Sequence, residues 1–241
     1  MNSSKKKLKA RDEFVHFAEE LLKEKFGKLN AVQQSHALTH FYIKEIHNRD
    51  RSQISDEDLE LAIVDGSSDL GCDLIHRDDK HVLIVQAKYR GHGAKEPSDS
   101  ISHFQAILKR ITDSSLKANS RLLDQISTID WKNDSFELVY LTFGSIDNQA
   151  RRIAQLPPHY PESVPDLDQR CVWSYLDETN LNEELRSKEP LGENDSSKPI
   201  TLFPVGLKGK RGASSVIGIE AGDFRSFIMA LEARQLGPVF S

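Results

Sequence analysis

Residues 82–88, with the sequence VLIVQAK, constrain the fold more than any other part of the chain. Aliphatic and β-branched side chains dominate this run, which is typical of a buried strand. Side chains two positions apart in a strand point the same way, so residues 82, 84, 86 and 88 share one face. That face changes from apolar (Val82, Ile84) to polar (Gln86, Lys88) along the run. We therefore predict a central strand that leaves the core at its carboxyl end and opens into a cleft.

Similar patterns predict the other elements of the first 150 residues. Helices are expected where apolar residues recur at spacings of three and four, at residues 12–26, 31–48 and, with a break, 101–129. Asp12 is the predicted N-cap of the first helix. Strands are expected where short runs are rich in aliphatic residues, at residues 59–64, 72–76, 82–88 and 136–143. Three consecutive strands with tight connections favour an antiparallel meander, and the helix before the fourth strand is long enough for a crossover.

Beyond residue 145 the sequence predicts a further α/β region. A short helix is expected near Asp147, and a Pro-rich loop follows it at residues 157–165. Strands are expected at residues 171–176, 200–205 and 215–220, and a final helix at residues 223–234. Residues 186–199 are typical of a linker or surface loop.

These elements suggest three parts in a chain whose 241 residues allow one or two domains. We expect a basic arm and N-terminal helix at residues 1–30, and an α/β core at residues 31–150. An accessory α/β extension is expected at residues 151–241.

Composition excludes several classes of protein. No run approaches the roughly 18 apolar residues that a membrane-spanning helix needs. The basic N-terminus is followed by Asp12 and Glu13 with no apolar stretch, so we expect no signal peptide. The two cysteines, Cys72 and Cys171, are too few for a disulfide scaffold or a multi-cysteine zinc site. We expect a reducing, cytoplasmic compartment. The net charge of −5 leaves nucleic-acid binding open, because such contacts depend on local basic patches.

The polar end of the central strand needs partners, since an unpaired buried charge costs several kcal/mol. A hairpin with the preceding strand could place the Asp73 carboxylate beside Gln86 and Lys88. Oxygen ligands suit Mg²⁺, which polarises a phosphate and lowers the pKa of a bound water. A nearby lysine can orient or deprotonate that water. The pattern therefore allows metal-assisted phosphodiester hydrolysis, while a purely structural Asp–Lys pair that closes the hairpin stays open.

The arrangement of Asp73 and Gln86-Ala87-Lys88 on this order of elements resembles the PD-(D/E)XK nuclease superfamily, in its Mrr-like branch with Gln-x-Lys. The segments SSDLGCD and VLIVQAKYR are also similar to the amino-terminal region of AIPR proteins, which are associated with abortive infection and phage resistance. The ending IGIEAGDFRSFIMALEARQLGPVFS resembles the same family. The resemblance covers most of residues 31–241. It implies a restriction-endonuclease-like fold and, because that family continues further, a missing C-terminal region.

The resemblance also implies roles for individual residues. Asp73 would bind the metal, Mg²⁺ or Mn²⁺, Gln86 would take the second ligand position, and Lys88 would be the catalytic lysine. An amide carries no charge, so Gln86 should hold a cation less tightly than a glutamate. Related branches recover an acid from the preceding helix, and Glu45 is the candidate there. Asp69 is an alternative ligand, although it could simply tighten the turn before Asp73.

The leading functional hypothesis is a metal-dependent nuclease that cuts DNA rather than RNA and acts in defence against phage. The alternative is a catalytically inactive module of a larger defence protein that binds or senses nucleic acid. A protein–protein scaffold is the third hypothesis. The oligomeric state is open, and a homodimer is one expectation because enzymes that cut both strands commonly use two protomers.

Overall fold

The computed structural model describes residues 10–48, 53–113, 117–187, 216–221 and 224–229. The chain divides into two compact units, Met1–Glu189 and Pro190–Ser241. The first unit carries all the candidate site residues.

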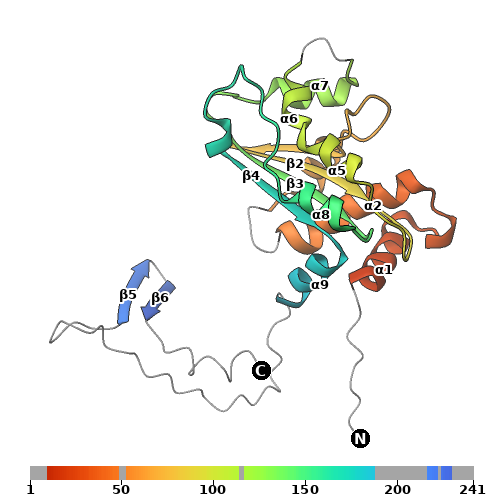
Figure 1. Cartoon of the computed structure of the whole chain (residues 1–241). Coiled ribbons are helices and arrows are strands. Elements are labelled where there is room, and N and C mark those ends of the chain that lie inside the picture. Colours follow the sequence, from red (N-terminus) through yellow and green to blue (C-terminus); the bar gives the residue numbers. More distant parts are fainter. Residues whose placement is uncertain (1–9, 49–52, 114–116, 188–215, 222–223, 230–241) are drawn as a thin grey trace, which may run out of the picture. The chain divides into compact units, whose positions relative to one another are not determined.

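A four-stranded mixed sheet forms the centre of the first unit (Figure 1). Its strands lie in chain order and are β1 (Leu74–Asp78), β2 (His81–Lys88), β3 (Ser135–Thr142) and β4 (Cys171–Leu176). Strand β1 is antiparallel to β2, whereas β2, β3 and β4 are mutually parallel. Parallel neighbours need a crossover connection, which the helices between these strands provide. The predicted α/β class is confirmed at this level.

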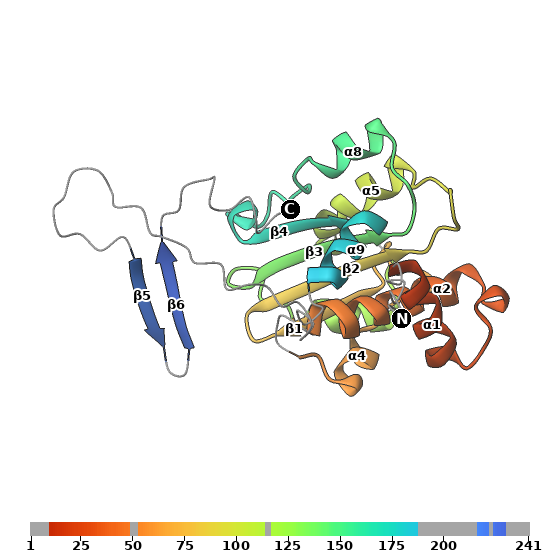
Figure 2. The same cartoon turned by 90° about the horizontal axis from the view of Figure 1, so that it is seen from below.

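Helices cover both faces of the sheet (Figures 1 and 2). One face carries α1 (Ala10–Leu22), α2 (Ala31–Tyr42) with its π-helical continuation Ile43–His47, α4 (Asp56–Ala62) and α9 (Glu178–Ser187). The other face carries α5 (Ser98–Gln105), α6 (Ile107–Ile111), α7 (Ser120–Ser127) and α8 (Asn148–Ala154). Two short 3₁₀ turns, Phe26–Lys28 and Leu167–Gln169, lie in the connections.

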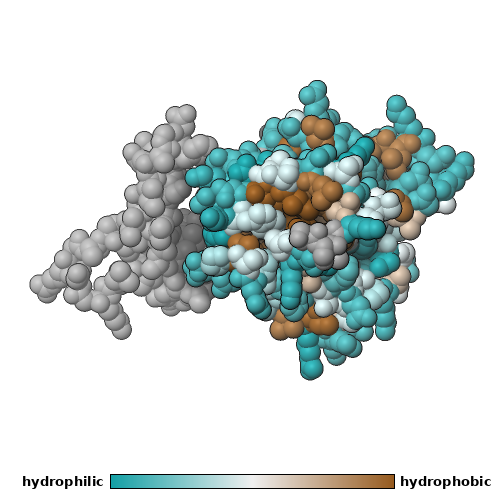
Figure 3. Space-filling view, turned by 90° about the horizontal axis from the view of Figure 1, so that it is seen from above, coloured by the Kyte–Doolittle hydropathy of each residue, from teal (hydrophilic) through white to brown (hydrophobic). Residues whose placement is uncertain are grey.

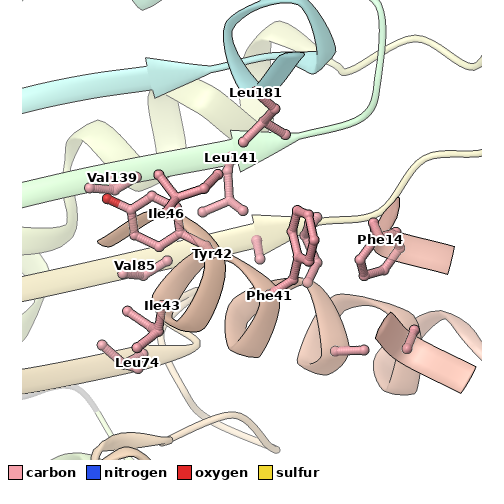
Figure 4. Packing of buried hydrophobic residues seen from close by; sticks show 14 of the residues in the cluster. Phe14, Phe41, Tyr42, Ile43, Ile46, Leu74, Val85, Val139, Leu141 and Leu181 are labelled. Atoms are coloured by element: carbon pink, nitrogen blue, oxygen red, sulfur yellow. The ribbon is translucent and has the colours of Figure 1, made fainter. Parts of the chain in front are cut away.

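Alternating side chains of the strands divide the core into two layers. Figure 4 shows the layer under α2, where Phe41 lies near Phe14 of α1 and Tyr42 and Ile46 lie over the sheet. Strand residues of this layer include Val85 and Val139. The intervening positions of β2 and β3 point to the opposite layer, beneath α5 to α8. Because β2 is buried on both sides, its aliphatic run is explained by packing.

Residues 59–64 were predicted as the first strand of a meander, and this prediction is wrong. They belong mostly to helix α4, whose N-cap Ser55 accepts a hydrogen bond from the Asp58 backbone N–H at 3.1 Å. Acidic residues in the first turn, such as Asp56 and Glu57, favour the helix further. Only an isolated antiparallel bridge between Ile63 and Leu74 remains of the expected pairing. The antiparallel part of the sheet is therefore the β1–β2 hairpin.

Other predicted elements agree with the structure within a few residues. The helices at 12–26 and 31–48, the broken helix at 101–129 and the strands at 136–143 and 171–176 are confirmed. The strand predicted from residue 72 begins at Leu74. Helix α1 starts at Ala10, so Asp12 lies within its first turn and is not its N-cap. Strand β4 joins the core sheet, which therefore continues past the boundary predicted at residue 150.

In the second unit the structure describes an antiparallel pair, β5 (Val216–Ala221) and β6 (Phe224–Met229). Strand β5 confirms the strand predicted at 215–220. The helix predicted at 223–234 is wrong over residues 224–229, where β6 obtains its backbone hydrogen-bond partners from β5. The strand predicted at 200–205 and nearly all of the linker predicted at 186–199 lie outside the described residues.

On the described surface, no helix has both the length and the apolar composition needed to cross a bilayer. Figure 3 shows one face of the molecule, where hydrophilic residues surround a central apolar area. Large apolar side chains that are more than half exposed occur on several elements, and they are Val32, Leu61, Leu123, Leu156 and Val172.

A buried carboxylate fixes the loop that follows β2. The Glu96 side chain is fully buried and receives two hydrogen bonds from Arg90, at 2.9 and 3.0 Å. It also accepts hydrogen bonds from the hydroxyls of Tyr140 and Thr142, both at 2.8 Å. Both oxygens of the Glu96 carboxylate therefore have hydrogen-bond partners inside the protein, which is the condition for a stable buried charge. The network ties the residues after Lys88 to strand β3.

We expect Glu96→Ala to lower the free energy of unfolding by about 3 kcal/mol or more, because Arg90 and two hydroxyls lose their acceptor. Urea titration followed by circular dichroism measures this change. The matched control is Asp99→Ala, which removes an exposed carboxylate in the first turn of α5 and should cost less than about 1 kcal/mol. Equal losses in the two variants would contradict the structural role of Glu96.

Candidate functional site

The β1–β2 hairpin brings Asp73 next to the Gln-x-Lys segment. The register pairs Leu74 with Val85, and Asp73 directly precedes Leu74 at the end of this ladder. The Asp73 backbone N–H donates to the Val85 carbonyl at 2.9 Å. Its side-chain Oδ2 accepts a hydrogen bond from the Ala87 backbone N–H at 2.6 Å. The expected proximity of Asp73 to this strand end is therefore present in the structure.

Three carboxylates converge at the start of β1. One carboxylate oxygen of each of Asp65, Asp69 and Asp73 lies within 4.8 Å of the other two. Among the described His, Cys, Asp and Glu residues, these three form the group that could hold a metal ion. Asp69 was an alternative ligand in the sequence analysis, and the structure places it beside Asp73. Asp65 was not among the predicted site residues.

The loop that carries Asp65 and Asp69 has an unusual backbone. Ser68, Leu70 and Gly71 all have positive φ angles, of 64°, 57° and 75°. Such conformations cost free energy for residues other than glycine. The Asp69 carboxylate compensates by accepting a hydrogen bond from the Gly71 N–H at 2.7 Å. Backbone geometry thus turns Asp69 toward the start of β1.

Helix α7 holds this loop from the other side. The Asn119 side-chain amide donates to the carbonyl of Val64 at 3.0 Å and to that of Ser67 at 3.4 Å. The Asn119 backbone N–H donates to the Ser68 carbonyl at 3.1 Å. Asn119 also accepts a hydrogen bond from the Leu122 N–H at 2.8 Å, which caps α7. One asparagine therefore anchors the acidic loop to a helix end.

Burial and mutual repulsion raise the pKa of two of the carboxyl groups. Desolvation is the main cause for Asp73, whose pKa rises to about 7, while the Lys88 charge and the Ala87 N–H oppose the rise. Desolvation followed by the Asp69 charge raises the pKa of Asp65, and Lys88 again opposes it. A divalent cation among these groups would remove the repulsion and favour their ionised forms.

Lys88 faces the same cavity as two of the carboxylates. This cavity of about 310 Å³ is lined by Asp65, Asp73 and Lys88, with further walls from the first turns of α2 and the residues after β2. The opposing effect of Lys88 on the pKa of Asp73 and of Asp65 shows that its charge reaches both groups. Lys88 is half-buried at the carboxyl end of β2, as the sequence predicted for a strand that opens into a cleft.

Gln86 lies close to the same loop but is more deeply buried, with 3% of its surface exposed. A Cβ atom at Gly71 would lie 3.2 Å from Gln86 Nε2 and also 3.2 Å from the His103 ring. Glycine is therefore required at position 71, both for its positive φ and for this close approach. The structure brings Gln86 beside the loop that carries Asp69. Gln86 does not line the cavity that Lys88 shares with Asp65 and Asp73.

Glu45 does not belong to the carboxylate group. It is half-buried in the π-helical segment that continues α2, whereas the oxygen cluster among the described residues consists of the three aspartates. A helical period of 3.6 residues would place Glu45 on the apolar face of the helix that packs on the sheet. A π-helix has a longer period, so it moves the following side chains around the helix axis. The prediction that Glu45 supplies the metal site with an acid from the preceding helix therefore has no support in this arrangement.

Sequence reasoning missed Asp65 and His103. Asp65, Asp69 and Asp73 recur every four residues, and this spacing in a turn-rich segment was the available signal. His103 on α5 packs against Gly71, and Arg110 contacts both the His103 ring and the Leu70 carbonyl. Nothing local to residues 98–111 predicts that contact, because it depends on how α5 and α6 pack on the sheet.

Comparison with protein-family models, curated proteins and solved structures finds no match. The chemistry of the site must therefore be inferred from its own residues. Carboxylate oxygens are the ligands that Mg²⁺ and Mn²⁺ prefer, and three of them meet here on a braced loop beside a lysine. The donor set thus fits a hard divalent cation.

The raised pKa of Asp73 makes a prediction about stability. Between about pH 4 and its folded pKa of about 7, the folded state binds more protons than the unfolded chain. Stability without metal should therefore fall as the pH rises through this range, at up to about 1.4 kcal/mol per pH unit. Asp73→Asn cannot ionise and retains an oxygen that can accept from Ala87. It should become more stable than the wild type as the pH rises to about 8.

Urea unfolding in a chelating buffer at about pH 5 and about pH 8 measures this difference. Asp78→Asn is the matched control, because Asp78 lies exposed at the other end of β1. Its stability should follow the wild type at both pH values. If the difference in unfolding free energy between the wild type and Asp73→Asn stays constant over the pH range, the ionisation of Asp73 does not cause the expected loss of stability.

Proposed function

We propose that the first unit of this chain is a divalent-metal-dependent phosphodiesterase. The convergence of three carboxylates, one of them buried and two of them lining one cavity with Lys88, carries the proposal. A structural Asp–Lys pair needs one carboxylate, whereas here burial, and then the charges of a second and third acid, raise the pKa of Asp73. An arrangement that costs stability is understandable when its geometry serves a ligand.

Each residue has a role in this proposal. Asp65, Asp69 and Asp73 would hold Mg²⁺ or Mn²⁺, which when bound would polarise a substrate phosphate and lower the pKa of a water molecule. Lys88 Nζ would donate a hydrogen bond to the attacking water or to a phosphate oxygen, and so orient the reactants. The Ala87 N–H keeps the Asp73 side chain in place. Gln86 would support the loop and, as a neutral amide, leave most of the charge to the aspartates.

The finer parts of the proposal rest on the resemblance to PD-(D/E)XK and AIPR proteins. They are the restriction-endonuclease-like fold, DNA as the substrate, and a setting in defence against phage. The β1–β2 hairpin, the crossover to β3 and the position of Lys88 at the end of β2 are compatible with that fold. A crossover helix and an Asp opposite a Gln-x-Lys strand are the features that support it.

A binding module without turnover is the second candidate function. The neutral Gln86 and the position of Glu45 outside the carboxylate group favour it, since fewer charged ligands hold a cation less tightly. Such a module would bind nucleic acid through phosphate contacts, with affinity that falls as salt rises and does not change with Mg²⁺.

Cleavage of a supercoiled plasmid in Mg²⁺ or Mn²⁺ tests the first proposal against the second. Asp73→Asn and Lys88→Met should each lower the rate by about 100-fold or more, because they remove the metal ligand and the lysine hydrogen bond. Lys80→Met is the matched control for the lysine, because Lys80 is exposed in the turn of the same hairpin. Asp78→Asn is the matched control for Asp73→Asn, because Asp78 lies exposed at the other end of β1.

Cutting by the wild type and both controls, together with its loss in both site variants, is the expected result. Equal cutting by all five proteins would mean that another site or a contaminant is responsible. Metal-independent, salt-sensitive binding of DNA without cutting by the wild type would favour the binding module instead.

A further inference from the structure

A second cavity system lies at the carboxyl ends of β3 and β4, away from the carboxylate group. Two adjoining hollows of about 640 and 470 Å³ share the side chains of Ile146, Arg151, Asp177 and Thr179. Each volume is within the range of small-molecule binding sites, which is about 300 to 1,000 Å³. We call the combined space the β3–β4 crevice.

The topology of the sheet creates this crevice. After β3 the chain enters α8, which packs beside α5 on one face of the sheet. After β4 it enters α9, which packs beside α1 on the opposite face. Adjacent parallel strands whose helices leave toward opposite faces separate their connecting loops. In open α/β sheets ligands bind at such a point, outside the carboxyl ends of the strands.

Aromatic rings form one wall of the crevice. Trp173 and Tyr175 of β4 line the smaller hollow. The Tyr175 ring stacks on Tyr140 with centroids 5.9 Å apart and planes at 12°, and the same side chain lines the smaller hollow. The Trp173 Nε1–H donates to the Ala154 carbonyl at 2.7 Å, which fixes the indole against α8. A rigid aromatic wall of this kind favours a planar ring.

The charged groups on the shared walls are open to a ligand. Arg151 is exposed, and its guanidinium makes no hydrogen bond or ion pair with the residues that the structure describes. Asp177 uses its Oδ1 to accept from the Thr179 and Asn180 backbone N–H groups at 2.8 and 3.1 Å. Its Oδ2 has no such partner within the described part of the chain. An unpaired guanidinium favours an anion such as phosphate, and a free carboxylate oxygen accepts from hydroxyl groups.

By contrast, the other arginine of the crevice is occupied. The Arg11 guanidinium donates to the carbonyls of Arg90 and Phe143, at 2.8 and 2.6 Å. It also forms an ion pair with Glu178 at 2.8 Å. Arg11 therefore builds the wall of the larger hollow, and of the two arginines among the described lining residues Arg151 is the one that remains for a ligand.

We propose that the β3–β4 crevice binds a free mononucleotide. A nucleotide supplies a planar base for the face of Tyr175, ribose hydroxyls for Asp177 and a phosphate for Arg151. This combination satisfies the three kinds of open group that line the crevice. The proposal is independent of the phosphodiesterase proposed above, because the two sites share none of the residues that carry them.

Tryptophan fluorescence provides the test in the 241-residue chain, whose two tryptophans are Trp131 and Trp173. Trp131 stacks on Phe136 and lines a different cavity, so Trp131→Phe leaves Trp173 as the sole reporter. Adenosine monophosphate should change its emission in a saturable manner. Ribose 5-phosphate, which lacks the base, should bind at least about tenfold more weakly.

Variants in the same background identify the contacts. Arg151→Met should weaken the binding of adenosine monophosphate about tenfold or more, since it removes the phosphate partner. Arg152→Met is the matched control on the next residue of α8, which does not line the crevice, and should leave the affinity unchanged. Tyr175→Phe retains the ring and should bind normally, whereas Tyr175→Leu should lose binding.

Titration calorimetry on the wild type repeats the measurement without any substitution, and thermal melts confirm that each variant is folded. The proposal is overturned if calorimetry and fluorescence both detect no saturable binding of adenosine monophosphate. It is equally overturned if Arg151→Met and Arg152→Met bind with the same affinity, or if the chain binds a short oligonucleotide there and not the mononucleotide.

Discussion

The hydrogen bond from the Ala87 backbone N–H to Asp73 Oδ2 connects the end of the β1–β2 hairpin to the candidate site. The paired register ends at Leu74 and Val85. Asp73 adds a backbone hydrogen bond to the Val85 carbonyl, and its side-chain carboxylate accepts from the Ala87 N–H. The Asp73 carboxylate is thereby fixed in the protein interior. Its desolvation raises its pKa, and a cation is the ligand that reverses this cost.

The sheet places two different chemistries along the carboxyl ends of its parallel strands. At β2 the acidic loop, Lys88 and the hairpin converge on an oxygen-rich centre that fits a divalent cation. At β3 and β4 the helices depart to opposite faces and leave a crevice with an aromatic wall and an open arginine. The buried Glu96 lies between these regions in the chain and ties the residues after β2 to β3. Rigid strands can therefore support both sites with loops of quite different composition.

The sequence predicted those parts of the structure that depend on local pattern. The aliphatic run of β2 and its polar end were sufficient to predict the strand and the proximity of Asp73. Residues 59–64 were misassigned because an apolar run of that length fits either a strand or a helix, and the Ser55 cap decides between them. Asp65 and His103 depend on loop conformation and helix packing, and the π-helical turn at Glu45 changes a period that sequence reasoning assumes to be constant.

The most direct test of the cation centre is an anomalous difference map from crystals of the wild-type chain soaked in Mn²⁺. We predict a peak between the carboxylates of Asp65, Asp69 and Asp73, with metal–oxygen distances of roughly 2.0 to 2.6 Å. The peak should be absent in Asp73→Asn crystals treated in the same way. A wild-type map without density there, or with Mn²⁺ bound only at exposed acids elsewhere, would contradict the account.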